Sequence, residues 1–308
     1  MAIIELLLRR TARLLLTVLL ITTIVFVTVR VIPGDPALTI AGMEATEQQV
    51  SAIRARLGTD QPLGVQYVSW LRASLRFDFG TSYFSNERVI DLILQRFPLT
   101  AMLALLSFAL ALTLAIPIGV VAAVKRWTLW DGLGLLFAQV GMAIPGFWLA
   151  IMLLLLFSVQ LGWLPLFGAD TPLHWVLPVI ALATERAAVL VRFVRSSMTE
   201  ELDKEYVLAA EAKGFPVWRV VLRHALRNAL LPVITVAGIQ FGYLLGGAVI
   251  IEQVFSLPGL GRLFLSAIHG RDFPLIQGGV VFIAVVFSVI NFLADVLYAV
   301  INPRIRVG

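Results

Sequence analysis

Glu205-Tyr-Val-Leu-Ala-Ala-Glu-Ala-Lys-Gly214-Phe-Pro216 is the stretch that decides the fold. It is polar enough to lie in water, yet it stands between apolar segments long enough to cross a bilayer. Good helix formers and charges of both signs predict a short solvated helix here. Gly214 can adopt the left-handed conformation that ends a helix, and Pro216 cannot continue one. We therefore expect the helix to stop at Gly214.

A second helix is expected directly after this stop. Apolar residues recur at helical spacing from Trp218 to Leu226, whereas Arg219, Arg223 and Arg227 lie four apart on another face. The pattern predicts an amphipathic, basic helix that precedes the next apolar segment.

Composition defines the class of protein. Hydrophobic residues make up 59% of the 308 residues, charged residues only 14%, and the mean hydropathy is +0.93. Soluble domains carry about 25% charged residues, so the chain is expected to be an all-α integral membrane protein. The net charge is +5, but the sequence contains no basic patch interleaved with aromatic residues. We therefore do not expect a nucleic acid as a partner. The absence of cysteine excludes disulfides and thiolate chemistry.

Six apolar segments predict six membrane-spanning helices. The third contains Pro145-Gly146 and is expected to break there. The region from Ala37 to Phe97 is too charged to span, and its patterning predicts two short amphipathic helices at Thr46–Leu57 and Gln66–Leu75. It is preceded by a rigid turn at Pro33–Pro36. The six segments are Leu14–Ile32, Pro98–Val124, Gly132–Leu161, Trp175–Val194, Leu230–Ile251 and Leu275–Ile301.

Positive charge predicts the orientation in the membrane. The arginines before the first span, the Lys125 loop, the 192–227 segment and the tail at Arg304 and Arg306 all fall on one side, which is cytoplasmic by the positive-inside rule. Both termini and the Glu205–Gly214 helix are then cytoplasmic. The Ala37–Phe97 region is extracytoplasmic.

Several motifs together resemble one family. Tyr206–Gly214 and the downstream Leu222–Pro232 are similar to the "EAA" loop of bacterial ABC importer permeases, although Leu208 and Arg227 depart from the general pattern. Further resemblance lies in the Pro-Gly-Asp-Pro turn, the stretches Glu252–Arg262 and Arg271–Gln277, and the carboxyl end Asp295–Arg306. The chain is identified as a member of the dipeptide, oligopeptide, glutathione and nickel permease family.

The resemblance implies how the chain is used. The Glu205–Gly214 helix would be the coupling helix that docks on an ATPase subunit, and the region after the fifth span would take part in docking an extracytoplasmic substrate-binding protein. The implied coupling residues are Glu205, Tyr206, Ala209, Ala210, Lys213, Gly214 and Phe215, and the implied docking residues are Glu252, Pro258, Gly259, Gly261, Arg271 and Asp272.

Two features within the spans bear on transport. Gly238, Gly242 and Gly246 recur every four residues, which predicts tight helix packing or a wall of the translocation pathway. Glu185 and Arg186 lie inside the fourth span, where charges are costly and usually face a cavity or a charged partner. A zwitterionic peptide or an interhelical ion pair would explain them.

No enzymatic site is expected. The three histidines fall on opposite sides of the membrane in this topology and cannot share a metal, and no catalytic residues converge. The P-loop with its lysine is missing, so ATP and Mg²⁺ would be bound by partner subunits.

We therefore predict a six-helix permease of the ABC importer type that moves short peptides by alternating access. Its parts are the N-terminus and first span (1–32), an extracytoplasmic subdomain (33–97) and a five-helix core (98–308) with a coupling loop at 195–228. Expected partners are a second permease, two ATPase subunits, a binding protein and the lipid of the inner membrane. A nickel importer of the same family and, more remotely, an ion-coupled secondary transporter are the alternatives.

Overall fold

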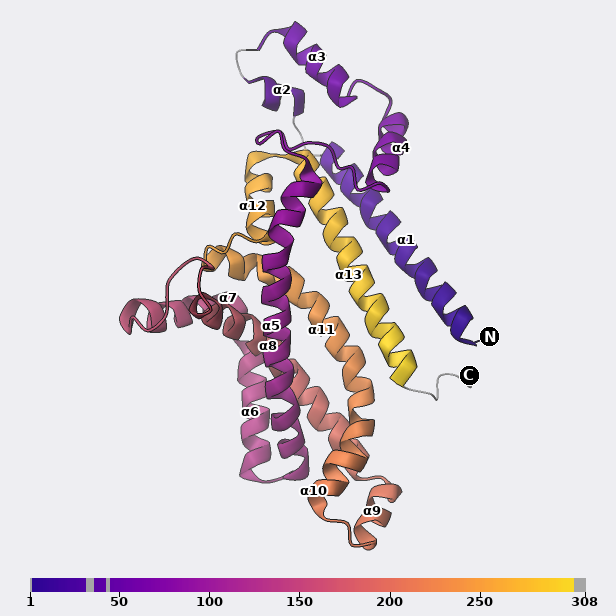
Figure 1. The fold of residues 1–308 in the computed structure, drawn as a ribbon, viewed down its shortest axis with the longest axis vertical. Helices are drawn as coiled ribbons and strands as arrows, with labels where there is room; N and C mark the ends of the chain where they lie inside the picture. The colour runs from indigo at the N-terminus through magenta and orange to yellow at the C-terminus, as the bar shows by residue number, and fades with distance from the viewer. Residues whose placement is uncertain (1, 32–35, 43–44, 302–308) are drawn as a thin grey trace. The chain divides into compact units, whose positions relative to one another are not determined.

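A computed structural model describes residues 2–31, 36–42 and 45–301, and these are almost entirely helical (Figure 1). Thr81 and Arg88 form an isolated β-bridge. Except for Pro36, the expected turn at 33–36 lies outside the described residues, as does the basic tail. The elements are α1 (Ala2–Val31), α2 (Pro36–Ala41), α3 (Glu47–Leu57), α4 (Leu63–Ser74), α5 (Val89–Val124), α6 (Leu129–Ala143), α7 (Gly146–Leu153), the π-helical turn η1 (Leu154–Gln160), α8 (Leu173–Leu202), α9 (Glu205–Ala212), α10 (Val217–Arg219), the π-helical turn η2 (Val220–Ala225), α11 (Leu226–Val254), α12 (Leu260–Gly270) and α13 (Phe273–Ile301).

Among the residues that the structure describes, four helices are long and apolar enough to cross a membrane, and a fifth span results if one bent helix pair is counted as one. The four lie at Arg10–Val31, Val89–Val124, Val217–Val254 and Phe273–Ala294. The 30-residue α8, which contains the expected fourth span, is not among them. The described residues thus contain long apolar helices, whereas the count of six spans stays a prediction.

The bent pair lies where the sequence predicts a break. Helix α6 ends at Ala143, α7 begins at Gly146, and the two parts of this segment are bent by 97°. Pro145 has no N–H and restricts the residue before it to an extended conformation, so Ile144 leaves the helical region with ψ 118°. The expected break is confirmed.

The helix after Pro216 differs from the prediction. We expected a separate amphipathic helix followed by a span from Leu230, but α10, η2 and α11 form one apolar helix over Val217–Val254. No glycine interrupts the sequence between Pro216 and Pro232, so nothing ends the helix, and Pro232 is accommodated inside it. The basic residues at its start are therefore rigidly continuous with a membrane span.

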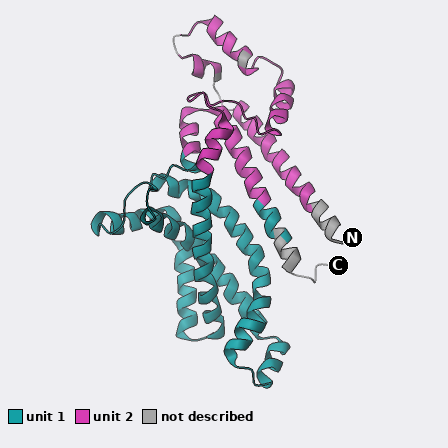
Figure 2. Cartoon of the chain, in the orientation of Figure 1, with its two compact units in different colours: residues 1–8, 98–262, 290–308 teal, residues 9–97, 263–289 magenta. Residues whose placement is uncertain are grey.

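The chain forms two compact units (Figure 2). Unit 1 comprises residues 1–8, 98–262 and 290–308, and at its centre α8 packs against α6, α7 and α11. A Cβ added at Gly141 of α6 would lie 2.7 Å from the Cβ of Ala188 in α8, so these two helices approach as closely as glycine permits. The buried carboxylate of Asp131 accepts two hydrogen bonds from Arg195, which joins the same helices.

Unit 2 comprises residues 9–97 and 263–289. Helices α3 and α4 lie where the two short amphipathic helices were expected. Thr46 caps α3 in a capping box with Gln49, which satisfies free N–H groups of its first turn. Helix α4 packs on α1 because the ring of Phe26 meets the rings of Tyr67 and Trp70 at centroid distances of 5.3 and 5.6 Å.

Candidate functional site

The α9 segment, residues 201–228, holds the predicted coupling helix. Helix α9 covers Glu205–Ala212 and ends as the sequence predicts. Gly214 has φ 79°, in the left-handed region where glycine is favoured, and its N–H donates to the carbonyl of Glu211 at 2.9 Å. The next N–H, of Phe215, donates to the carbonyl of Ala210 at 3.3 Å. The predicted short helix with a glycine stop is confirmed.

One face of α9 belongs to the core of unit 1. Val207 is 1% exposed and Ala210 is 7% exposed, and both join the hydrophobic cluster that contains Met198 of α8 and Val221 of η2. Ala210 thus packs inward, and of the three small residues expected to lie against a partner only Ala209 and Gly214 are exposed. Because α9 is packed on both helices, it cannot shift without displacing them.

A polar cluster joins the same helices. Tyr206 donates a 2.6 Å hydrogen bond to the carboxylate of Glu201 in α8 and accepts a 3.1 Å hydrogen bond from the amide of Asn228 in α11. Lys204 forms an ion pair with the other carboxylate oxygen of Glu201. Glu201 is only 7% exposed, so these partners compensate a buried charge.

The electrostatics of the cluster follow from this geometry. Burial alone would raise the pKa of Glu201, but hydrogen bonds from Lys204 and Tyr206 and the charge of Lys204 together lower it below its ordinary value. Burial and the bond to Glu201 raise the pKa of the Tyr206 hydroxyl. The carboxylate therefore stays charged and the phenol stays a donor at neutral pH.

Sequence reasoning missed the two ends of this cluster. Glu201 stands out in the sequence only by its spacing from Lys204, which is typical of a surface ion pair. Asn228 lies 22 residues beyond Tyr206 and has no periodic signal. The short distance between them arises because α8 and α11 lie side by side, which no local pattern encodes.

The other face of the α9 segment is exposed and apolar. Leu208 is 58% exposed and Trp218 is 62% exposed, which is unusual for side chains outside a membrane span. The guanidinium of Arg219 lies 5.5 Å from the ring of Trp218. Charges of both signs border the apolar residues. The outer face consists of Glu205, Leu208, Ala209, Lys213, Gly214, Phe215, Val217, Trp218 and Leu222.

The charged pair in α8 is not the interhelical ion pair that was considered. Glu185 and Arg186 are neighbours in one helix and bond to each other at 2.9 Å. The contact between helices is instead a 3.0 Å hydrogen bond from Arg186 to the side-chain oxygen of Gln240 in α11, and the ring of Tyr243 lies 5.5 Å from the guanidinium. Glu185 remains 39% exposed.

The three glycines of α11 that recur every four residues have different surroundings. A Cβ at Gly238 would lie 2.6 Å from the Cβ of Ala294 in α13, so this glycine permits close packing within the chain. Gly242 is buried, whereas a Cβ at Gly246 would meet no heavy atom within 4 Å. Packing therefore accounts for Gly238, and Gly246 faces a surface that the described part of the chain leaves open.

The segment after α11 is organised around Glu252. This side chain is 0% exposed and accepts hydrogen bonds from the hydroxyl of Thr100 and from the backbone N–H groups of Gly261 and Arg262. A Cβ at Gly259 would overlap the carboxylate, so glycine is required for this approach. Of the expected docking residues in this segment, only Pro258 is exposed, and Glu252 supports the turn from within.

Asp272 plays the same internal part in unit 2. It is 1% exposed and accepts hydrogen bonds from the hydroxyl of Ser82 and the N–H of Tyr83. Arg271, with φ 57°, is exposed beside it. Of the two predicted docking residues Arg271 and Asp272, a second protein can therefore contact only Arg271 directly.

Comparison with known proteins shows which family has this architecture. The family described as "Binding-protein-dependent transport system inner membrane component" matches residues 115–307, and its N-terminal counterpart matches residues 3–104. The "Glutathione transport system permease protein GsiC" of Salmonella typhimurium is 44% identical over 97% of this chain and 98% of its own length. A "Putative peptide transport system permease protein" of Brucella abortus is 42% identical over 98% of each chain.

Solved structures show the same fold. An inward-facing MetNI methionine ABC transporter chain superposes with a TM-score of 0.56 over 69% of this chain and 97% of that chain, at 17% sequence identity. The fold and the family matches define an all-helical integral membrane protein, a permease subunit of an ABC importer. The chain belongs to the family of binding-protein-dependent transport system inner membrane components.

Proposed function

We propose that this chain is one of two membrane-spanning subunits of an ATP-driven importer of short peptides, glutathione included. The outer face of the α9 segment is the observation that carries the proposal. It exposes Leu208, Phe215 and Trp218 at the surface, while its inner face is bonded to α8 and α11. Such a face suits a partner whose movement has to reach the spans.

The partner we propose for this face is an ATPase subunit that binds ATP and Mg²⁺. Two such subunits, a second permease and an extracytoplasmic binding protein would complete the importer. Closure of the ATPases would push α9, and Tyr206 and Val207 would transmit the push to α8 and α11. This chain would supply no catalytic residue, and its inner-membrane orientation would place α9 and both termini in the cytoplasm.

In this proposal, each part of the chain that the sequence defined has its own role. Residues 33–97 would form an extracytoplasmic subdomain, and with Pro258 and Arg271 they would contribute to docking the binding protein. Glu185 and Arg186, which lie beside the exposed Tyr243, would be near the translocation pathway. A second permease would cover the open side of Gly246.

Peptide rather than nickel is the proposed cargo because the relatives named above are glutathione and peptide permeases. An ion-coupled carrier is disfavoured because the family is binding-protein-dependent. The test is to isolate the chain with its partners, reconstitute the complex with its binding protein, and measure ATP-dependent uptake of glutathione, a tripeptide and Ni²⁺. Uptake of Ni²⁺ alone would reject the peptide assignment, and uptake without ATP would reject the importer.

A further inference from the structure

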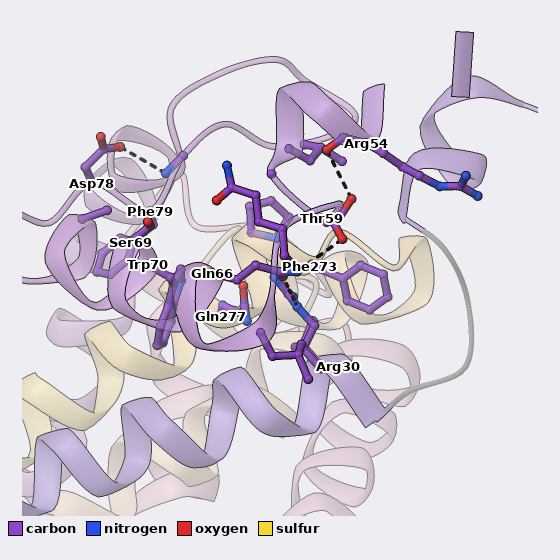
Figure 3. Close-up of a pocket in the computed structure, with 18 of the residues that line it drawn as sticks. Arg30, Arg54, Thr59, Gln66, Ser69, Trp70, Asp78, Phe79, Phe273 and Gln277 are labelled. Carbon is purple, nitrogen blue, oxygen red and sulfur yellow. Dashed lines mark hydrogen bonds between the residues drawn. The ribbon is translucent and has the colours of Figure 1, made fainter. Parts of the chain in front are cut away.

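Unit 2 contains a cavity of about 590 Å³ that the transport mechanism proposed above does not use (Figure 3). It lies among the end of α1, the α3–α4 region, the loop around Phe79 and the start of α13. Its volume is within the range of small-molecule sites, roughly 300–1,000 Å³. Arg30 and Ser69 at its wall are solvent-exposed, so a ligand can reach it.

Gln277 gives the first indication of what the cavity binds. This side chain is 6% exposed, lines the cavity, and its Nε2 donates to no acceptor in the described part of the chain. An unpaired buried amide donor costs about 1–3 kcal/mol, so it is normally retained only where a ligand or water accepts its hydrogen bond. A ligand oxygen would satisfy it.

Arg30 supplies a positive charge at the same wall. Its Nε donates to the side-chain oxygen of Gln66 at 3.0 Å, and its guanidinium lies 4.8 Å from the ring of Phe26. No carboxylate of the described residues forms an ion pair with it. The side-chain oxygen of Gln66 already accepts from Nε of Arg30. The two terminal nitrogens of the guanidinium therefore remain available to donate to an anion.

Tyr83 adds a third donor. Burial raises the pKa of its hydroxyl to about 12, so the phenol is protonated throughout the physiological range. The described residues provide no hydrogen-bond partner for that hydroxyl. A cation, an amide N–H and a phenol O–H thus line one cavity, and each is a donor from which a carboxylate oxygen can accept.

The remaining walls favour an organic ligand over an inorganic anion. Trp70, Phe79 and Phe273 present aromatic surface, which contacts carbon and not phosphate oxygens. Asp78 lies on the opposite side of the view from Arg30 in Figure 3, and its exposed carboxylate suits an ammonium group. Opposite charges separated by an apolar wall match a small zwitterion.

We infer that this cavity binds the carboxylate of a small organic acid, with Arg30 and Gln277 as its principal contacts. A short peptide, bound by its carboxyl end, is the form of ligand that we expect; this choice of ligand, though not the carboxylate site itself, rests on the proposed function. The permease would then hold peptide on its extracytoplasmic side independently of the binding protein.

The test uses the complete transporter complex in phosphatidylcholine nanodiscs without its binding protein. Equilibrium dialysis measures radiolabelled trialanine against its C-terminal amide. We expect the acid to bind at least about tenfold more tightly, because the amide loses the charge-assisted bonds. Arg30→Gln should abolish that preference and Gln277→Met should reduce it several-fold, whereas the matched control Arg76→Gln, on an exposed arginine outside the cavity, should leave it intact.

Equal binding of acid and amide, or an acid preference that survives Arg30→Gln, would overturn the inference. The cavity would be assigned to a lipid headgroup instead if three results coincide. Native mass spectrometry would show a phosphatidylglycerol that stays bound to the parent, Arg30→Gln would release that lipid, and the complex would bind no tripeptide. ATP-dependent uptake with the binding protein added separates the two proposals. Uptake without cavity binding rejects the inference alone, and cavity binding without uptake of any peptide rejects the proposed function alone.

Discussion

The hydroxyl of Tyr206 bonds to Glu201 of α8 at 2.6 Å and receives a hydrogen bond from Asn228 of α11 at 3.1 Å, so one side chain joins three helices. Tyr206 is in the first turn of α9, and its neighbour Val207 is buried in the core of the same unit. Apolar packing resists separation of α9 from the bundle, while the directional polar bonds resist its rotation. The exposed face of α9 is therefore connected to the spans by a short rigid path.

Tyr206→Phe tests this path. The substitution keeps the ring but leaves the buried Glu201 with one donor fewer, at a cost of about 1–3 kcal/mol to the contact. We expect fewer peptides to be transported per ATP hydrolysed in proteoliposomes. Tyr67→Phe, which removes the 2.8 Å contact of a tyrosine hydroxyl with Thr23 in unit 2, is the control and should keep the ratio. An unchanged ratio in Tyr206→Phe would show that the path does not carry the coupling.

Gly214→Asp tests the outer face. At φ 79° Asn and Asp are both tolerated better than other side chains, and a Cβ there meets no non-neighbouring atom of the described residues within 4 Å. Gly214→Asn therefore matches the backbone strain of Gly214→Asp without its charge. We expect Asp to abolish uptake and ATPase co-purification while the chain still inserts in the membrane, with Asn intermediate. Normal uptake by Gly214→Asp would contradict the docking role.

Local signals in the sequence predicted the elements that depend on local chemistry. Pro145 predicted the break before α7, Gly214 predicted the end of α9, and the apolar runs predicted the long helices. The family motifs predicted the class of protein, because several in the right order cover nearly the whole chain. The continuous helix through η2 was missed because charge and apolar periodicity do not show where a helix continues unbroken.

Contacts between distant segments could not be predicted. Glu252 was assigned to a docking surface because its motif resembles a segment of the peptide permeases, yet it is buried against Thr100, which lies 152 residues away. Gln277 and Arg30 were not connected by any pattern, and only the fold brings α13 and α1 to one cavity. A carboxylate that stabilises a turn and one that faces a partner look the same in a single sequence.

The turn around Glu252 yields a stability prediction. A Cβ at Gly261 would lie 2.3 Å from the Cα of Val249, a backbone atom that cannot move aside. We expect Gly261→Ala to destabilise the chain by at least about 1–3 kcal/mol, the usual cost of overpacking. The measurement is the fraction that survives heating in detergent. Gly132→Ala, where a Cβ meets nothing within 4 Å, should match the parent, and equal survival of both variants would exclude the close contact.

Substitutions at two glycines of α11 test packing within the chain and assembly with the second permease separately. Gly238→Ala would crowd Ala294 and should lower the heat stability of the isolated chain. Gly246→Leu adds bulk where no other described part of the chain comes within 4 Å of a Cβ, so the isolated chain should be as stable as the parent while recovery of the second permease falls. Co-purification measured beside heat survival distinguishes them. Full recovery of the second permease with Gly246→Leu would show that this face is not the interface.

The Glu201 cluster makes the stability of α9 depend on pH. The pKa of Glu201 is lowered in the folded chain, so its contribution is present above the ordinary carboxyl value of 4.5 and is lost as pH falls through the lower folded value. We expect the amides of Val207 and Ala210 to lose protection against hydrogen exchange in that acid range, after correction for the intrinsic exchange rate.

Glu201→Gln provides the matched control for this acid loss. The amide keeps an oxygen that can accept from Tyr206 but does not titrate, so protection of α9 should become flat with pH and lower than in the parent at neutrality. A parallel acid loss in the variant and the parent would assign the effect to other groups. A variant as protected as the parent at pH 7 would mean that the charge of Glu201 contributes nothing to holding α9 against α8, and the Tyr206 contact alone would then account for that attachment.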